Sequence, residues 1–178
     1  MIAISYVDRS NKFKENVRKC AYHFNRLAKR LKRHKLIGTI REPEYSSVDV
    51  EFAYYSQRIM RIPAVVSVDV GQFIKLRPRK LPDGSDSEQL YNDILDSEGF
   101  VKSTSVYGSF VKKVSKKASL YLTEYPAGRI VLGIGVVHIK LGDLAKYYPK
   151  SLRRGEVDRN DAEIMIIDTI VTLLENMP

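Results

Sequence analysis

The sequence predicts an α+β fold, in which a mainly antiparallel sheet is packed by a long basic N-terminal helix and by a C-terminal helix. Three observations support this class. Residues 12–35 place apolar side chains at steps of three and four, as on one face of an α-helix. Residues 47–52 and 66–77 alternate between apolar and polar side chains, as in half-buried antiparallel strands. Residues 160–174 return to a helical spacing, so we expect helices at both ends of the chain.

The N-terminal helix follows a short strand expected at residues 2–7, and we expect Asp8 or Ser10 to cap it. Its apolar face consists of Phe13, Val17, Cys20, Ala21, Phe24, Leu27, Ala28 and Leu31. Basic residues crowd the last turns, where positive charge stabilises the helix dipole, and we expect Gly38 to end the helix. The pattern predicts a packed inner face and a strongly basic outer face.

Two half-buried strands should follow this helix. The apolar faces consist of Val48, Val50 and Phe52 in the first strand, and of Val66, Val68, Val70, Ile74 and Leu76 in the second. Pro63 is expected in the connection between them, because a proline lacks the N–H that a central strand needs. Residues 77–86 hold two prolines, a glycine and several charges, which predicts a surface loop. A short helix over 87–96, ended by Gly99, should come next.

Residues 105–122 combine strand-forming residue types with a helical spacing. Thr, Ser, Val and Tyr favour a strand, but seven positions fit one helical face, so we expect a helix. These positions are Tyr107, Phe110, Val111, Val114, Ala118, Tyr121 and Leu122. On that helix, Lys112, Lys113, Lys116 and Lys117 would form a basic stripe on the opposite side.

The last third of the chain contains one strand and one helix. Residues 129–141 form an apolar run rich in β-branched side chains, which predicts a central strand buried on both faces. Residues 146–154 are expected to form a basic, tyrosine-bearing loop. The final helix should begin at Asp158 or Asn160. Its expected apolar face consists of Ile164, Ile167, Ile170, Val171 and Leu174.

Size and charge narrow the class of protein. A chain of 178 residues with 44% hydrophobic residues can form one domain, residues 1–178, with a proper core. Its net charge of +9 is uneven, because residues 1–80 carry 18 basic and 7 acidic side chains. The single cysteine, Cys20, excludes an internal disulfide, and no run is apolar enough for a membrane span or a secretion signal. We expect a cytoplasmic or otherwise intracellular protein.

The concentration of positive charge predicts a polyanionic partner, with nucleic acid the first choice. Residues 12–35 hold ten Lys or Arg and a single acid, Glu15, whereas a merely solvated helix usually interleaves acids with bases. The candidate binding residues are Lys12, Lys14, Arg18, Lys29, Arg30, Lys32, Arg33, Lys112, Lys113, Lys116 and Lys117. Without a base-reading motif, we expect sequence-independent contacts to the backbone.

A second hypothesis is a structural or assembly subunit, such as a homo-oligomer or a virion-type component. Its basic face would then meet an acidic protein partner or line a nucleic-acid channel, and the apolar stretch 170–174 would supply an interface.

Adjacent tyrosines occur at 54–55 and 147–148. We expect them to pack as ordinary amphipathic residues, with one ring inward and one outward, rather than to stack on bases.

A third hypothesis is a metal-dependent phosphoryl- or nucleotidyl-transfer enzyme. Asp49 and Glu51 lie two residues apart on a strand, so both carboxylates share a face and could hold one divalent metal ion. Residues 133–138, a glycine-rich strand that ends in His138, would lie beside them. This combination resembles the primase-polymerase family, and the resemblance implies Asp168 as a third acid.

The sequence departs from that family at two positions. Val136 stands where the family has a small hydroxyl residue, and Asp168 lies in an apolar helix rather than at a strand end. We therefore interpret Asp49 and Glu51 as the ordinary solvent-facing side chains of a strand rather than as metal ligands. The sequence holds no nucleophile elbow, phosphate-binding loop or dinucleotide motif, so we expect no cofactor and favour a binding protein over an enzyme.

Overall fold

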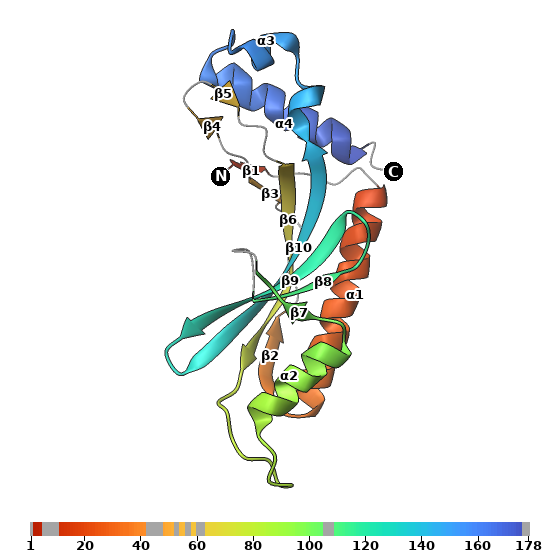
Figure 1. Ribbon diagram of the computed structural model, residues 1–178, viewed down its shortest axis with the longest axis vertical. Coiled ribbons are helices and arrows are strands. Elements are labelled where there is room, and N and C mark those ends of the chain that lie inside the picture. The colour runs from red at the N-terminus through yellow and green to blue at the C-terminus, as the bar shows by residue number, and fades with distance from the viewer. Residues whose placement is uncertain are drawn as a thin grey trace. The chain divides into compact units, whose positions relative to one another are not determined.

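The computed structural model has the predicted α+β class (Figure 1), and it describes residues 2–4, 11–41, 48–51, 54–55, 58–59, 63–104 and 109–175. The chain divides into two compact units. The central unit comprises residues 17–44 and 69–137, and the terminal unit comprises residues 1–16, 45–68 and 138–178. Three of the boundaries fall inside α1 (Asn11–Arg33), β6 (Pro63–Lys75) and β10 (Ile130–Asp143), so each of these elements contributes residues to both units.

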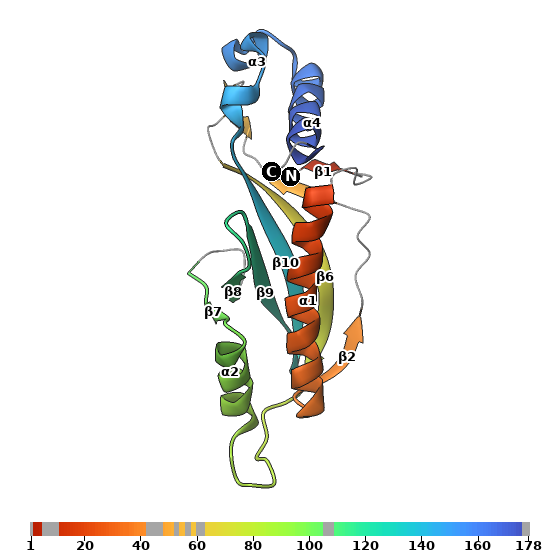
Figure 2. The ribbon, with the colours of Figure 1, turned by 90° about the vertical axis from the view of Figure 1, so that its right-hand side faces the viewer.

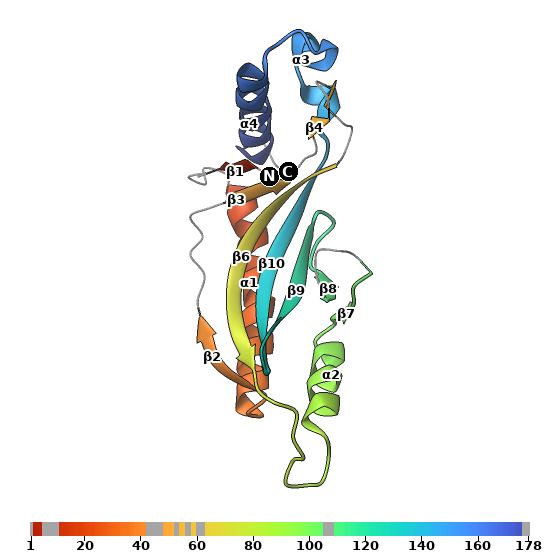
Figure 3. The same cartoon turned by 90° about the vertical axis from the view of Figure 1, so that its left-hand side faces the viewer.

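The central unit is built on a six-stranded antiparallel sheet. The strand order is β2 (Ile37–Arg41), β6, β10, β9 (Ala118–Ala127), β8 (Phe110–Lys113) and β7 (Val101–Lys102). Within this unit, α1 runs along one face of β6 and β10, as the two side views show (Figures 2 and 3). The long N-terminal helix predicted from residues 12–35 is thereby confirmed as a helix that packs on the sheet.

The inner face of α1 is buried as its spacing predicts. Seven of the eight predicted apolar residues are at most 6% exposed, namely Val17, Cys20, Ala21, Phe24, Leu27, Ala28 and Leu31. The side chain of the eighth, Phe13, lies outside the described residues. Burial raises the pKa of the Cys20 thiol to about 12, so this sulfur behaves as a small apolar group rather than as a reactive thiolate.

Phe24 packs directly on the backbone of the sheet, because the strands beneath it carry glycines. A Cβ at Gly135 of β10 would lie 2.6 Å from Phe24 Cε2, and a Cβ at Gly71 of β6 would lie 2.9 Å from Phe24 Cδ1. Gly71 also has a φ of +149°, which side-chain-bearing residues rarely adopt. One step away, Gly133 leaves room for Phe73, whose ring stacks against that of Phe24 at 6.0 Å. The two rings fill the centre of the unit.

The end of α1 differs from the prediction. The helix ends at Arg33, and Lys35 rather than Gly38 takes the left-handed conformation, with a φ of 55°. The Leu36 N–H donates to the Leu31 carbonyl at 3.0 Å, which is the six-to-one bond of a Schellman ending. Gly38 instead lies in β2, a strand that the sequence did not predict.

The helix predicted at 105–122 was wrong. Residues 110–113 and 118–127 form the hairpin strands β8 and β9, which pair Phe110 with Leu122 and Lys113 with Ser119. Ala118, Leu120 and Leu122 are buried at alternate positions, so the strand-forming residue types prevail once a partner strand buries one face. Lys112 and Lys113 therefore lie on β8, and Lys116 and Lys117 lie in the turn. The predicted basic helical stripe does not form.

The loop and helix predicted after β6 are confirmed. Helix α2 (Ser87–Ser97) begins after Asp86, whose carboxylate accepts the Glu88 N–H at 3.0 Å. It ends at Ser97, just before the cap residue Glu98 and Gly99, which has a φ of 86° as expected of the predicted stop. Its buried face holds Tyr91, Ile94 and Leu95. Residues 76–85 form the exposed surface loop between β6 and α2.

The terminal unit has a smaller set of paired strands. β1 (Ile2–Ile4) pairs with β3 (Val48–Glu51), and β3 pairs with β6 so that Asp49 lies opposite Ser67. β4 (Tyr54–Tyr55) and β5 (Arg58–Ile59) form a separate pair. Pro63 begins β6 instead of lying in a connection, and the first position of a strand is one where proline is tolerated. Phe52, predicted to continue the face of β3, lies outside the described residues.

The segment predicted as a basic loop at 146–154 is largely helical. It contains the end of the 3-10 helix η1 (Leu144–Tyr147) and the short helix α3 (Lys150–Arg154), which Gly155 ends with a φ of 70°. Within the adjacent tyrosines of this segment, Tyr147 is 49% exposed and Tyr148 is buried. One ring faces inward and one outward, as expected of amphipathic packing.

The final helix, α4 (Arg159–Glu175), begins as predicted, because Asp158 Oδ1 accepts the Asp161 N–H at 2.9 Å. Its buried face was predicted in part wrongly. Ala162, Ile166 and Ile170 are buried at steps of four, whereas Ile164 is 57% exposed. Residues 164–167 are apolar without interruption, so the spacing alone fits more than one face. Among the described helices, no stretch is long and apolar enough to cross a membrane.

The glycine beneath Phe24 gives a direct test of this packing. Gly135→Ala should lower the free energy of unfolding by about 1–3 kcal/mol, because the new methyl group overlaps a ring that has nowhere to move. Chemical denaturation measures the change. Gly38→Ala is the matched control, since its Cβ would meet nothing closer than 3.7 Å, and its effect should stay within about 0.5 kcal/mol. Equal effects of the two variants would contradict this packing.

Candidate functional site

The outer face of α1 exposes most of its basic residues. Arg18, Lys19, Arg26, Lys29, Lys32 and Arg33 are exposed, and Lys14 and Arg30 are partly exposed. The side chain of Lys12 lies outside the described residues. Because the inner face is anchored on the sheet, these charges are carried by a rigid element rather than by a free helix.

Part of this face is hollowed into a groove of about 440 Å³ within the central unit. It is lined by Tyr22, Asn25, Arg26, Lys29, Arg30 and Arg33 of α1 and by Glu98 at the end of α2. We refer to these seven residues as the α1 groove. Four cations and one carboxylate give it a net charge of +3.

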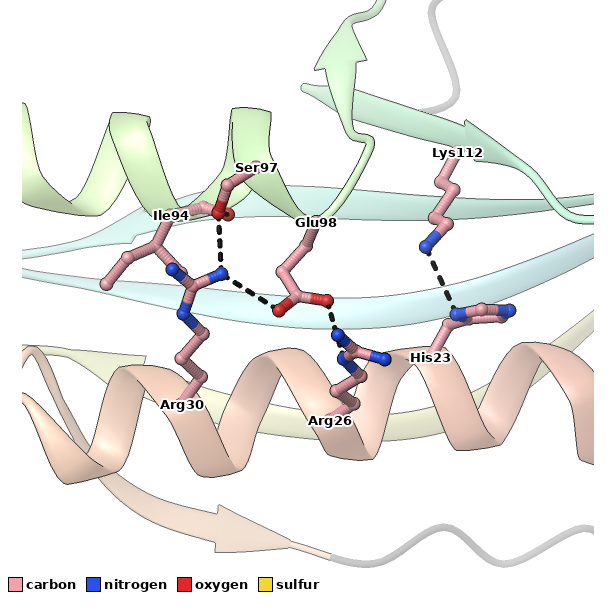
Figure 4. A network of polar contacts seen from close by, with 7 residues as sticks. All are labelled: His23, Arg26, Arg30, Ile94, Ser97, Glu98 and Lys112. Atoms are coloured by element: carbon pink, nitrogen blue, oxygen red, sulfur yellow. Dashed lines mark hydrogen bonds and ion pairs between the residues drawn. The ribbon is translucent and has the colours of Figure 1, made fainter.

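Glu98 orders two of the four cations. Its carboxylate is 5% exposed, and it accepts from Arg26 Nε at 3.1 Å and from Arg30 Nη1 at 3.0 Å. Arg30 Nη1 also donates to Ser97 Oγ at 2.6 Å, and Ser97 Oγ donates to the Ile94 carbonyl at 2.9 Å. Figure 4 shows this network between α1 and the last turn of α2. Both oxygens of Glu98 are thus engaged by guanidinium groups, which in turn are held in fixed orientations.

A second contact links α1 to β8. Lys112 Nζ lies 3.1 Å from His23 Nδ1, a distance at which a neutral imidazole accepts a hydrogen bond from the ammonium (Figure 4). Burial lowers the pKa of His23, the charges of Lys112 and Arg26 lower it further, and Glu98 opposes them. The His23 ring in turn meets Tyr22 edge-on, with centroids 5.5 Å apart and planes at 75°. Lys112 therefore helps to fix the aromatic end of the groove.

The structure brings together only part of the predicted set. Lys29, Arg30 and Arg33 line the α1 groove, and Lys112 reaches α1 through His23. Lys14, Arg18 and Lys32 lie on α1 but do not line the groove. Lys113, Lys116 and Lys117 are exposed on β8 and in the turn after it, and none of them lines the groove.

Sequence reasoning missed the aromatic member of the groove. Tyr22 is 61% exposed and shares a line on the helix with Arg26, Arg30 and Arg33, at steps of four, four and three. That spacing was available in the sequence, but stacking was considered only for adjacent tyrosine pairs, and Tyr22 has no adjacent tyrosine. Glu98 lies 68 residues from Arg30, so its pairing had no local signal.

The predicted surface loop after β6 also brings positive charge beside the end of α1, which the candidate set of binding residues did not include. Arg77, Arg79 and Lys80 are exposed, and Arg79 Nη2 donates to the Lys35 carbonyl at 3.1 Å. The Leu76 N–H donates to the Leu36 carbonyl at 3.1 Å, which fixes the start of this loop beside the turn after α1. Positive charge therefore continues past the last turn of the helix.

The residues of the metal hypothesis are not seen to form a site. The side chains of Asp49 and Glu51 lie outside the described residues, His138 is buried in β10, and Asp168 is exposed on α4. The glycines of the 133–138 segment make room for Phe73 and Phe24. Across the described part of the chain, no three His, Cys, Asp or Glu side chains cluster as metal ligands would.

Comparison with protein-family models, with curated proteins and with solved structures gives no match for this chain.

Glu98→Gln tests the ordering of the arginines. The amide keeps the shape of the side chain but removes a buried charge that two guanidinium groups share, so the free energy of unfolding should fall by about 1–3 kcal/mol. The expected loss is modest because Arg26 and Arg30 remain partly solvated. Glu156→Gln, in an exposed pair 3.8 Å from Arg154, should change stability by less than about 0.5 kcal/mol. A Glu98→Gln protein as stable as the wild type would show that the pairs contribute nothing.

His138 predicts a loss of stability in mild acid. Burial lowers its pKa from 6.5 to about 4, so the unfolded chain binds a proton at a pH where the folded protein does not. Stability should therefore fall as the pH drops from about 6.5 towards 4, by at most about 1.4 kcal/mol per unit of pKa difference.

Thermal unfolding across that pH range provides the measurement. The Tm of His138→Gln should fall less steeply than that of the wild type, whereas His34→Gln, at an exposed position, should leave the slope unchanged. Parallel curves for wild type and His138→Gln would assign the pH dependence to other groups.

Proposed function

We propose that this protein is a non-enzymatic nucleic-acid-binding protein that holds the polyanion in the α1 groove. The observation that carries the proposal is the charge of the groove: four cations face solvent, and both oxygens of its one carboxylate are already engaged by arginines. A phosphate backbone entering the groove would meet donors that are already oriented. Recognition would be largely independent of sequence, because phosphate contacts position a strand without reading its bases.

The length of the basic surface favours a polymer over a small anion. Tyr22 and Arg33 are eleven residues apart, which corresponds to about 16 Å along a helix. Arg18 precedes this stretch on α1, and the loop with Arg77, Arg79 and Lys80 follows its far end. A small ligand is usually enclosed on most sides, whereas this track continues beyond the groove at both ends.

The same charge would also attract an acidic protein, which is the partner of the alternative assembly-subunit hypothesis. Polyglutamate distinguishes the two partners, because it carries negative charge without phosphates or bases. Stronger binding to polyglutamate than to an oligonucleotide of equal charge would favour the acidic-protein partner and overturn the proposal.

Lys29→Gln combined with Arg33→Gln tests the groove itself. Both side chains are exposed, so the variant should fold normally. Fluorescence anisotropy with a labelled oligonucleotide should show affinity reduced by about tenfold or more at 50 mM salt. The slope of log K against log salt should shrink by about two units, one for each lost phosphate contact.

Lys102→Gln combined with Arg129→Gln is the matched control. It removes one lysine and one arginine from exposed positions that do not line the groove, so the net charge falls equally. The control should bind almost as the wild type does. Equal losses of oligonucleotide affinity in the two double variants would mean that overall charge, rather than the α1 groove, holds the ligand. If the wild type shows no detectable binding at low salt, the proposed function is refuted.

A further inference from the structure

We infer that the strand held in the α1 groove is single-stranded, with an unpaired base stacked on Tyr22 and its phosphates on the cations that follow along α1. This inference rests on the proposed function and names the form of nucleic acid that the groove fits. It is carried by the position of one exposed aromatic ring and by the way α2 flanks the helix.

Tyr22 has the exposure and the surroundings of a stacking platform. Its side chain is 61% exposed at the end of the groove, and Arg26 follows it one turn later on the same line of the helix. The edge-on contact with His23 restricts the ring, and the hydrogen bond between Lys112 and His23 restrains that neighbour. An aromatic ring beside cations is the combination that single-strand binders use for bases and backbone.

Duplex nucleic acid does not expose a base face on which the Tyr22 ring could stack. In a duplex the faces of the bases are covered by their neighbours, so an aromatic ring on a helix surface meets only the backbone or the groove edges. An unpaired strand exposes the faces of its bases and lets each base turn towards the protein. The ring thus favours unpaired over paired strands.

The setting of α1 also disfavours insertion into the major groove. That groove is about 12 Å wide, which is close to the diameter of one helix with its side chains. The end of α2 is bound to the outer side of α1, through Arg30 with Ser97 at 2.6 Å and through Glu98 with Arg26 and Arg30. With α2 bound to its side, α1 is too wide to enter the major groove of a duplex at these positions.

The test compares Tyr22→Ala with two matched variants. Tyr22→Phe keeps the ring, and Tyr125→Ala removes another exposed tyrosine, which is 53% exposed on β9 and does not line the groove. The probes are labelled strands of twelve thymidines or twelve uridines, a twelve-base-pair duplex, and a twelve-unit abasic strand with the same phosphates. Circular dichroism confirms that each variant is folded.

The wild type should bind the thymidine or the uridine strand more tightly than the duplex or the abasic strand. Tyr22→Ala should weaken binding of that strand by about five- to 150-fold, the range expected for one lost stack. Its affinity for the abasic strand should stay unchanged, and Tyr22→Phe and Tyr125→Ala should bind as the wild type does. A preference between thymidine and uridine strands would reflect the sugar or the 5-methyl group of thymine, and either preference supports a single strand.

Two results would overturn the inference. One is a Tyr22→Ala protein that binds the thymidine and uridine strands as tightly as the wild type does. The other is a wild type that prefers the duplex. If Lys29→Gln with Arg33→Gln still weakens binding in either case, the proposed function stands and only the single-strand inference fails. If no probe binds the wild type at low salt, both fail together.

Discussion

The packing of Phe24 on glycine is the constraint from which the rest of the central unit follows. A helix can rest on a sheet in many rotations about its own axis, but the ring fits only where Gly71 and Gly135 leave the backbone uncovered. On the sheet, the Phe73 ring lies over Gly133 and stacks against the Phe24 ring. Because close-packed interiors tolerate little displacement, the rotation of α1 is fixed, and so is the direction in which its polar residues point.

That rotation explains why only some of the basic residues line the α1 groove. With the line of Phe24 facing the sheet, the line of Arg26 and Arg30 faces the end of α2, where a buried carboxylate receives them. Lys29 and Arg33 stay on the solvent side of the groove. The groove therefore holds two kinds of cation: Arg26 and Arg30, which also tie α1 to α2, and Lys29 and Arg33, which extend into solvent.

The sequence predicted what local periodicity determines and missed what distant partners decide. The inner face of α1 was predictable because its spacing is unambiguous over 15 residues, from Val17 to Leu31. The caps of α2 and α4 are local, because each carboxylate accepts an N–H only two or three residues further along the chain. Residues 105–122 fitted both periods, and only pairing between β8 and β9 resolved them as strands. The basic surface was predicted, but the position of Glu98 was not, because tertiary packing alone brings it to α1.

The buried carboxylate sets the character of the groove as well as its stability. Removing Glu98 would raise the raw positive charge, but Arg26 and Arg30 would then be long, flexible side chains that lose entropy whenever a phosphate orders them. Held by Glu98, the two guanidinium groups have already lost much of that freedom, so less would be lost on the proposed binding. Under the proposed function, Glu98 lowers the charge of the groove by one unit but orders two of its arginines, and the solvated Lys29 and Arg33 would supply the salt-dependent attraction to the polyanion. Under this proposal, Arg26 and Arg30 would orient the phosphates, and Lys29 and Arg33 would attract them. Because these are different side chains of one helix, a substitution can change one contribution and leave the other in place.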